Sequence, residues 1–172
     1  MRRKQMVFIG GSRRISRLNE EVRNRLDNLM ENGLTVAVGD ANGADKAVQE
    51  YLADKGYRQV NVFCMVGRCR NNVGRWLTRE IDPPAGARGF EFFSAKDRVM
   101  AEEADYGLML WDGKSRGTLA SVNDMVSKGK PVVVYLTPSK AFMTLRRPDQ
   151  VYKIASGTIH SNHRRAPAGA RP

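Results

Sequence analysis

The 172-residue sequence has few cysteines and few histidines, and none of its apolar runs approaches the length of a membrane span. A transmembrane helix needs about 20 consecutive apolar residues, so we expect no membrane partner. Cys64 and Cys69 are the only cysteines, and their spacing matches neither a zinc motif nor a disulfide framework. No signal-peptide cleavage pattern follows the basic start of the chain. We therefore expect reduced thiols, a cytoplasmic location, and no metal or cofactor.

The scarcity of histidine also excludes a class of catalysis. His160 and His163 are the only histidines, and both lie in the C-terminal stretch of small, polar and basic residues. A serine–histidine–acid triad in the domain is therefore not expected. The letters GKS at residues 113–115 resemble the end of a P-loop, but the position of the first P-loop glycine is Leu108. The sequence is thus not that of a P-loop NTPase.

Positive charge is concentrated at the two ends of the chain. The formal net charge is +11, and residues 1–4 and 146–172 carry most of the excess, so residues 5–145 are only mildly basic. Basic ends are typical of proteins that contact the phosphates of nucleic acid. Basic tails that only increase solubility are more common still, and this second interpretation is favoured here.

Apolar runs with strand spacing alternate with helical patterns along the chain. Strands are predicted at residues 6–9, 34–38, 60–65, 106–111 and 132–136, with helices between them. Residues 67–93 lose this periodicity, which predicts an irregular flap, and Ser94 is the expected N-cap of the next helix. Residues 139–156 are expected to add a short helix. We therefore divide the chain into a domain over residues 1–156 and a basic, disordered tail over residues 157–172.

This alternation predicts a three-layer Rossmann-like α/β domain with a mainly parallel five-stranded sheet. Right-handed crossovers place the C-terminal ends of all parallel strands on one edge. The loops that follow the first, second and fourth strands should therefore meet there. Ligands of open α/β sheets bind at this edge, where the strand order reverses.

Each of these three loops is rich in glycine and leads into a helix. Glycine allows a close approach of the backbone to a ligand, and a helix N-terminus favours phosphate. The candidate ligand-binding residues come from these three loops and from the start of the helix that follows the flap, which carries two basic side chains. They are Gly10, Gly11, Ser12, Arg13, Gly39, Asp40, Gly43, Asp45, Lys96, Arg98, Asp112, Gly113, Ser115, Gly117 and Thr118. The sequence identifies no catalytic residue among them.

The aspartates of these loops have two interpretations. In the first, they bind ribose hydroxyls or a base amino group of a ligand. In the second, they cap the helix that follows. Asp40 and Asp112 directly follow strands, which favours ligand contact, whereas capping is slightly favoured for Asp45. In the flap, Trp76 either stacks on a base or fills a small core. The arginines of the flap that are expected to meet phosphates are Arg68, Arg70, Arg75 and Arg79.

Five segments together resemble the SLOG superfamily, and most of all its YspA branch, which is related to cytoplasmic YpsA. These segments are VFIGGSRR, VAVGDANGADKAVQEYL, NVGRW, FEFFSAKDRVMAEEADYGLMLWDGKSRGT and KPVVVYLTP, and they extend over residues 5–138. The superfamily has a Rossmann-like fold and includes LOG-type phosphoribohydrolases, the DNA-processing protein DprA and sensor domains of antiphage systems. The resemblance implies binding of a nucleotide or a nucleotide-derived ligand.

One position departs from the LOG enzymes, whose Pro-Gly-Gly-x-Gly-Thr-x-x-Glu pattern carries the catalytic glutamate. Gly117 and Thr118 match the Gly-Thr pair, but the glutamate position is Ser121. Cleavage at a ribosyl carbon needs a carboxylate, so an ordinary LOG reaction is not expected, although another aspartate could substitute. The leading hypothesis is a nucleotide-binding sensor or subunit. The alternatives are an N-glycosidic hydrolase or transferase and a DprA-like nucleic-acid binder, and the sequence is compatible with a homo-oligomer.

Overall fold

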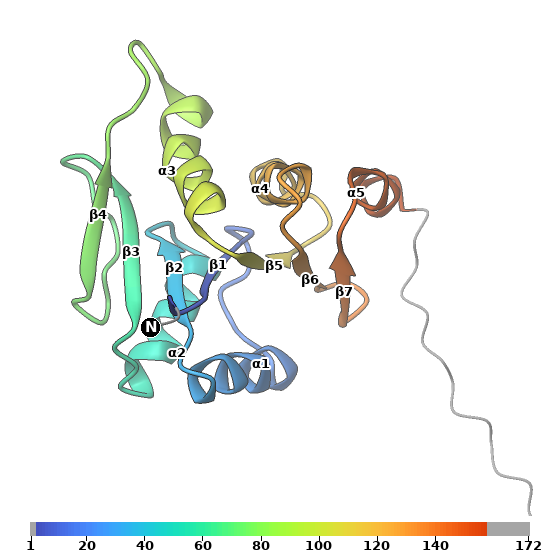
Figure 1. Cartoon of the computed structure of the whole chain (residues 1–172), viewed down its shortest axis with the longest axis horizontal. Coiled ribbons are helices and arrows are strands. Elements are labelled where there is room, and N and C mark those ends of the chain that lie inside the picture. Colours follow the sequence, from blue (N-terminus) through green and yellow to red (C-terminus); the bar gives the residue numbers. More distant parts are fainter. Residues whose placement is uncertain (1–2, 158–172) are drawn as a thin grey trace, which may run out of the picture.

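The computed structural model describes residues 3–157, which form a seven-stranded sheet with helices on both faces (Figure 1). The strands are β1 Met6–Gly11, β2 Thr35–Gly39, β3 Val60–Met65, β4 Leu77–Ile81, β5 Tyr106–Trp111, β6 Val132–Leu136 and β7 Ala141–Leu145. The helices are α1 Glu20–Glu31, α2 Ala44–Asp54, α3 Gly89–Glu103, α4 Arg116–Ser127 and α5 Pro148–Ala155.

The sheet has the strand order β4-β3-β2-β1-β5-β6-β7. Every neighbouring pair is parallel except β6 and β7, which are antiparallel. From β1 the chain moves outward through β2, β3 and β4, and then returns to place β5 on the other side of β1. The strand order therefore reverses between β1 and β5, and the C-terminal ends of these two strands form the expected binding edge.

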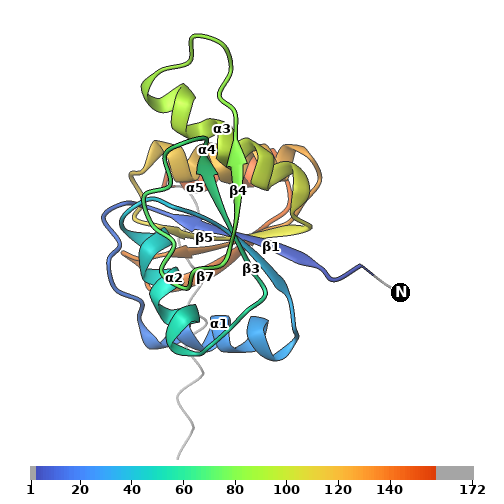
Figure 2. The same cartoon turned by 90° about the vertical axis from the view of Figure 1, so that its left-hand side faces the viewer.

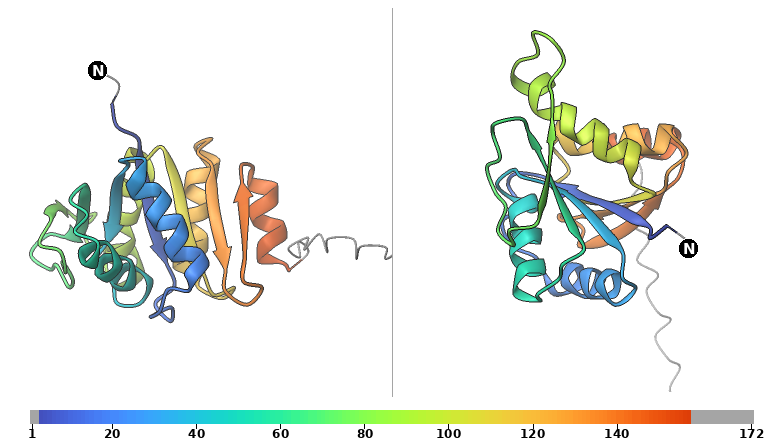
Figure 3. Two further views of the ribbon diagram at one scale, coloured as in Figure 1. Left: turned by 90° about the horizontal axis from the view of Figure 1, so that it is seen from below. Right: turned by 60° about the vertical axis from the view of Figure 1, so that its left-hand side comes forward.

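Two hydrophobic clusters fill the spaces between the sheet and its helices. Helices α1 and α2 cover one face, and α3, α4 and α5 cover the other (Figures 1 and 3). Val22, Leu26 and Leu52 bury the apolar stripes of α1 and α2 against the first face. Met100 and Met125 do the same for α3 and α4 on the second face. Central strands covered on both faces read as continuous apolar runs, which is why the sequence predicts them well.

The prediction of a Rossmann-like, mainly parallel α/β fold is confirmed, but the predicted number of five strands is wrong. The additional strands are the two edge strands, β4 and β7. β4 has the sequence LTREI, and its side chains are mostly exposed, so it has no apolar run to reveal it. Charged side chains are common on edge strands because they oppose further strand pairing. β7 follows a tight turn at Lys140, whose φ is +50°, and lies in the segment assigned only to a helix.

The segment 67–93 is not irregular throughout, as the sequence suggested. It contains β4, and α3 begins within it at Gly89. Ser94 is therefore buried inside α3 and does not cap it, because the N-cap residue is Arg88. The connection between β4 and α3 extends beyond the end of the sheet (Figure 2). The short helix predicted within 139–156 is present as α5, with Pro148 in its first turn.

No helix within residues 3–157 is long and apolar enough to cross a membrane. The predicted disorder of the tail concerns residues that, apart from Gly157, lie outside the described part of the chain. His160 and His163 lie there as well.

Candidate functional site

A pocket of about 680 Å³ opens at the C-terminal edge of the sheet, where the strand order reverses. Its walls are the loops after β1, β2 and β5, Arg70 from the segment after β3, and the N-terminal halves of α3 and α4. Pockets for small ligands commonly measure roughly 300–1,000 Å³. The three glycine-rich loops therefore meet at one pocket whose size suits a small ligand.

The structure brings nine of the fifteen candidate residues to the pocket wall. They are Gly10, Gly11, Arg13, Asp45, Lys96, Asp112, Ser115, Gly117 and Thr118. Six do not line it: Ser12, Gly39, Asp40, Gly43, Arg98 and Gly113. Of these six, Arg98 is exposed, and its guanidinium donates to Ser94 Oγ. The other five belong to the framework that shapes the loops.

Ser12 and Asp112 join the loops after β1 and β5. The Ser12 hydroxyl donates to Asp112 Oδ1, which also accepts the backbone N–H groups of Lys114 and Ser115. Burial would raise the pKa of Asp112, but these donors outweigh it and lower the pKa. The carboxylate is therefore ionised and already occupied by protein donors. Its position on the pocket wall is compatible with the ligand contact favoured from the sequence, but much of its accepting capacity is used within the loop.

Close backbone packing explains two of the glycines. Gly43 has a φ of +90°, and a Cβ there would lie 2.3 Å from the carbonyl oxygen of Arg13. A Cβ at Gly11 would lie 2.5 Å from the carbonyl oxygen of Leu110. Both positions thus permit contact between neighbouring loops and strands. Gly117 is different, because a Cβ there would meet only the Phe90 ring, at 3.6 Å, so its lack of a side chain leaves room in the pocket.

The first turn of α4 presents hydrogen-bond donors to the pocket. Ser115 is the N-cap, and its hydroxyl oxygen accepts from the Thr118 backbone N–H. The first N–H groups of a helix have no partner within the helix and carry a partial positive charge. Arg13, Arg14 and Lys114 add full positive charges to the pocket wall. This end of the pocket is suited to an anion.

Asp40 is held by Arg70 and does not line the pocket. Its carboxylate is almost fully buried and accepts two guanidinium hydrogen bonds, of 2.8 and 3.2 Å, and one from the Arg70 backbone N–H at 2.9 Å. Burial would raise the pKa of Asp40, but the hydrogen bonds and charge of Arg70 outweigh it and lower the pKa. The ion pair positions Arg70, which lines the pocket. The ligand contact favoured for Asp40 from the sequence is therefore not what its carboxylate makes here.

Asp45 lies in the first turn of α2, is buried, and reaches the pocket wall. Its Oδ2 accepts the Ala41 N–H, so it also contributes to the loop after β2, in keeping with the capping interpretation. Burial raises the pKa of Asp45 to about 7, and the positive charge of Lys96 opposes part of this rise. Lys96 is itself buried and pairs with Asp97 at 2.9 Å. The pocket thus contains a carboxyl group that changes protonation near neutral pH.

The sequence did not single out several residues of the pocket wall. Arg14, Phe90 and Phe93 line it, and the Arg70 guanidinium carbon lies 4.6 Å from the centre of the Phe93 ring. The aromatic cluster FEFF directly before the predicted helix was the available signal. The predicted helix began at Ser94 rather than at Gly89, which left this cluster in the irregular flap.

The other flap residues that the sequence singled out, Trp76 and the arginines at 68, 75 and 79, do not line the pocket. Trp76 packs against the first hydrophobic cluster, and its indole N–H donates to the Tyr57 carbonyl, which agrees with the core interpretation. Arg79 pairs with Glu103, and Arg75 lies beside Trp76. Arg68 lies 5.5 Å from the centre of the Phe93 ring. Of the four flap arginines, only Arg70 lines the pocket.

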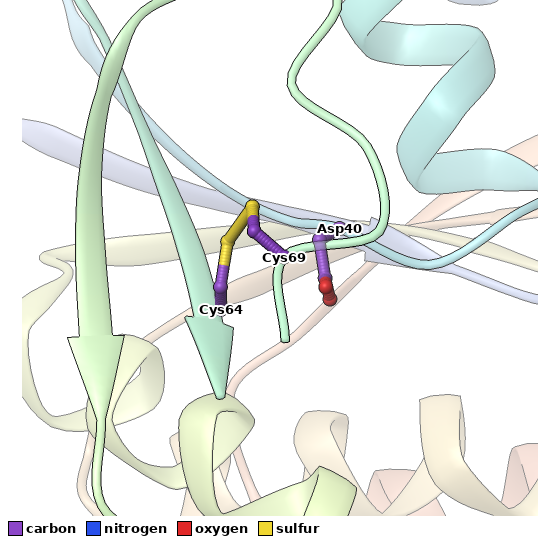
Figure 4. A group of neighbouring side chains, drawn as sticks. All are labelled: Asp40, Cys64 and Cys69. Atoms are coloured by element: carbon purple, nitrogen blue, oxygen red, sulfur yellow. A yellow bond between two sulfur atoms is a disulfide. The ribbon is translucent and has the colours of Figure 1, made fainter. Parts of the chain in front are cut away.

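The prediction of reduced thiols is wrong, because Cys64 and Cys69 form a disulfide (Figure 4). The bond joins the end of β3 to the turn that follows it. These sulfur atoms and an oxygen of Asp40 lie within 4.8 Å of one another. The sequence spacing had no pattern to reveal the bond, since the two residues come together only through the turn at residues 65–68. While both sulfurs are bonded to each other, this group does not suit a metal ion.

Four basic residues near the chain ends, Arg3, Lys4, Arg146 and Arg147, lie at the N-terminal ends of the parallel strands, opposite the pocket. Arg3 pairs with Asp105 and Lys4 donates to Gln59, and these acceptors directly precede β5 and β3. Figure 3 shows the N-terminus at this end of the strands. Arg146 and Arg147 follow β7, whose end pairs with the start of β6. Charge at the ends and charge at the pocket are therefore separate features.

No family model matches the chain, and a search of curated proteins finds no match. Among solved structures, the chain is similar to DNA processing protein A from Helicobacter pylori, described for its single-stranded DNA binding mode. The identity is 20%, the TM-score is 0.55, and the alignment covers 76% of this chain and 64% of that chain. The chain thus shares the Rossmann-like fold of that protein.

Proposed function

We propose that the pocket binds a nucleotide or a nucleotide-derived ligand, with a phosphate at the N-terminus of α4. The observation that carries this proposal is the turn from Ser115 to Thr118, which combines an anion-binding helix end with the open space at Gly117. Arg13 and Lys114 lie on the same wall and supply charge to a phosphate. Asp45, Asp97 and Asp112 are the carboxyl groups on the pocket wall that could contact ribose hydroxyls, because Asp40 is bound to Arg70.

The proposed role is that of a sensor or a subunit of a larger system rather than a glycosidase. Ser121 lines the pocket at the position where a LOG-type enzyme carries its glutamate, and a serine hydroxyl is a poor substitute for a carboxylate in that reaction. The motifs support placement in the SLOG superfamily near its YspA branch. Asp45, Asp97 and Asp112 keep the glycosidase alternative open to test, because all three carboxyl groups lie on the pocket wall.

Single-stranded DNA is a second candidate ligand, and a specific observation favours it. DNA processing protein A, with the same Rossmann-like fold, is described as binding single-stranded DNA. The pocket wall carries Arg13, Arg14 and Arg70, which suit a phosphodiester as well as a free phosphate. Both candidates share one chemistry, a nucleotide unit whose phosphate meets α4, and they differ in whether that unit is free or part of a strand.

Equilibrium binding to a matched panel tests this function. We expect AMP and dTMP to bind, adenosine and thymidine to bind far more weakly, and Gly117→Val to abolish the difference while the variant remains folded. A strand of ten thymidylates that binds much more tightly than dTMP, with affinity falling steeply as salt increases, would identify DNA as the ligand. Sustained release of free base from AMP would identify a glycosidase. Equal affinity for nucleosides and nucleotides would contradict a phosphate site.

A further inference from the structure

Phe90 is a large apolar side chain that the fold leaves exposed at the pocket. It lies in the first turn of α3, and 63% of its surface is accessible. The other large exposed apolar residues among residues 3–157 are Val66, Val73, Leu77 and Tyr152. None of these four lines the pocket, whereas Phe90 does. Single exposed apolar residues are common on protein surfaces, so the position of Phe90 is more informative than its exposure.

The ring of Phe90 lies beside the proposed phosphate site. Its Cε2 atom is 3.6 Å from the point where a Cβ of Gly117 would lie, and Gly117 belongs to the first turn of α4. The aromatic ring and the anion-binding helix end are therefore neighbours on one wall. In a nucleotide, one sugar separates the phosphate from the base, so a phosphate at α4 brings the base close to this ring.

The neighbouring aromatic residue is engaged differently. Phe93 is half-buried, and the guanidinium carbons of Arg70 and Arg68 lie 4.6 and 5.5 Å from the centre of its ring. The ring of Phe93 thus already faces cationic groups of the protein. Phe90 has no cation–π or aromatic partner among the described contacts of residues 3–157, so its ring remains accessible to a ligand.

We propose that Phe90 is the stacking platform for the base of the nucleotide that the pocket binds. This inference rests on the proposed function. It assigns a protein contact to the base, which is the part of the ligand for which the glycine-rich loops provide no partner. Stacking on an aromatic ring tolerates every base, because each base has a π-face. Phe90 therefore gives the site a preference for ligands that carry a base, while the helix end and the arginines hold the phosphate.

Binding of three probes to wild type and two variants of Phe90 tests the inference. The probes are AMP, dTMP and ribose 5-phosphate, which keeps the sugar phosphate but has no base. We expect Phe90→Ala to weaken binding of AMP and dTMP by on the order of tenfold, because a stacked base is typically worth that much. Ribose 5-phosphate should bind wild type and Phe90→Ala equally. Phe90→Trp should retain the wild-type affinity for AMP and dTMP.

Tyr152→Ala is the matched control, because Tyr152 is an aromatic residue that is 76% exposed on α5 and away from the pocket. It should leave all three affinities unchanged. The thermal unfolding of each variant shows that it folds. If wild type binds AMP and Phe90→Ala binds it equally well, the stacking role is wrong while the phosphate site stands. If wild type binds none of the probes, the proposed function fails, and the inference fails with it.

Discussion

Ser12 and Asp112 exchange two hydrogen bonds across the point where the strand order reverses. The Ser12 hydroxyl donates to Asp112 Oδ1 over 3.0 Å, and the Asp112 backbone N–H donates to Ser12 Oγ over 3.1 Å. Ser12 is almost fully buried and follows β1, whereas Asp112 follows β5. This reciprocal pair fixes the positions of the two loops that form the phosphate end of the pocket.

Replacement of Ser12 by alanine should lower the free energy of unfolding by about 1–3 kcal/mol, because it leaves the backbone N–H of Asp112 without its acceptor and removes one of the three donors to Asp112 Oδ1. Urea unfolding measures this change. Ser139→Ala is the control, since that half-buried hydroxyl makes only a long hydrogen bond of 3.4 Å within a turn, and its effect should stay below about 0.5 kcal/mol. Equal effects of the two substitutions would show that the Ser12 bonds do not hold the loops.

Elements whose side chains are buried were predictable from the sequence, and those at the edges of the sheet were not. β3 contains the apolar run at residues 62–65 because both of its faces are covered, whereas β4 is exposed and carries Arg79 and Glu80. The meeting of the three glycine-rich loops follows from chain topology, which the alternation of strands and helices reveals. The pairing of Asp40 with Arg70 could not be predicted from the sequence, because Arg70 lies in a turn that has no periodic pattern.

The Asp40–Arg70 pair predicts an asymmetric response to substitution. Arg70→Ala should lower the free energy of unfolding by about 3–5 kcal/mol, because it leaves a buried carboxylate without its cation. Adding Asp40→Asn should restore part of this loss by removing the charge. Arg79→Ala breaks a more exposed pair with Glu103 and should cost less than about 1 kcal/mol. A double variant that is less stable than Arg70→Ala would contradict this account.

The same pair also predicts how stability responds to acid. The pKa of Asp40 is lower in the folded protein than its ordinary value of 3.8. The contribution of the Asp40–Arg70 pair to the free energy of unfolding is therefore fully present above about pH 4. It is lost as the pH falls through the folded-state pKa of Asp40.

Asp45 predicts the opposite pH dependence. Its pKa is about 7 in the folded protein against 3.8 ordinarily, so between these values the folded state holds a proton that the unfolded state has released. Stability should therefore fall as pH rises from about 4 to about 7, by on the order of 4 kcal/mol. The charged groups around it are Lys96, Asp97 and Asp40.

Urea unfolding of Asp45→Asn across this pH range tests that dependence. The neutral amide should remove most of the decline and leave the variant more stable than wild type above pH 7. Asp54→Asn, at the exposed far end of the same helix, should keep the wild-type profile. An unchanged profile in Asp45→Asn would show that another group titrates.

The disulfide predicts a modest stabilisation, because it closes a short loop from Cys64 to Cys69. The loop-closure entropy of a segment of this length corresponds to about 2 kcal/mol, so Cys69→Ser should lower the free energy of unfolding by about that amount. Alkylation of the unfolded protein followed by mass measurement gives an independent check. No cysteine should react before reduction, and two labelled cysteines without reductant would contradict the pairing.

Backbone amide NMR during titration with AMP tests the central claim most directly, since it reports where the ligand binds. The account predicts that the largest shifts occur at Gly11, Arg13, Ser115, Gly117 and Thr118. Amides at the opposite edge of the sheet, such as those of Lys4, Thr35 and Val132, should stay within the noise. Saturable shifts confined to that opposite edge, or no shifts at the α4 turn when AMP is bound, would contradict a nucleotide site at the end of β1 and β5.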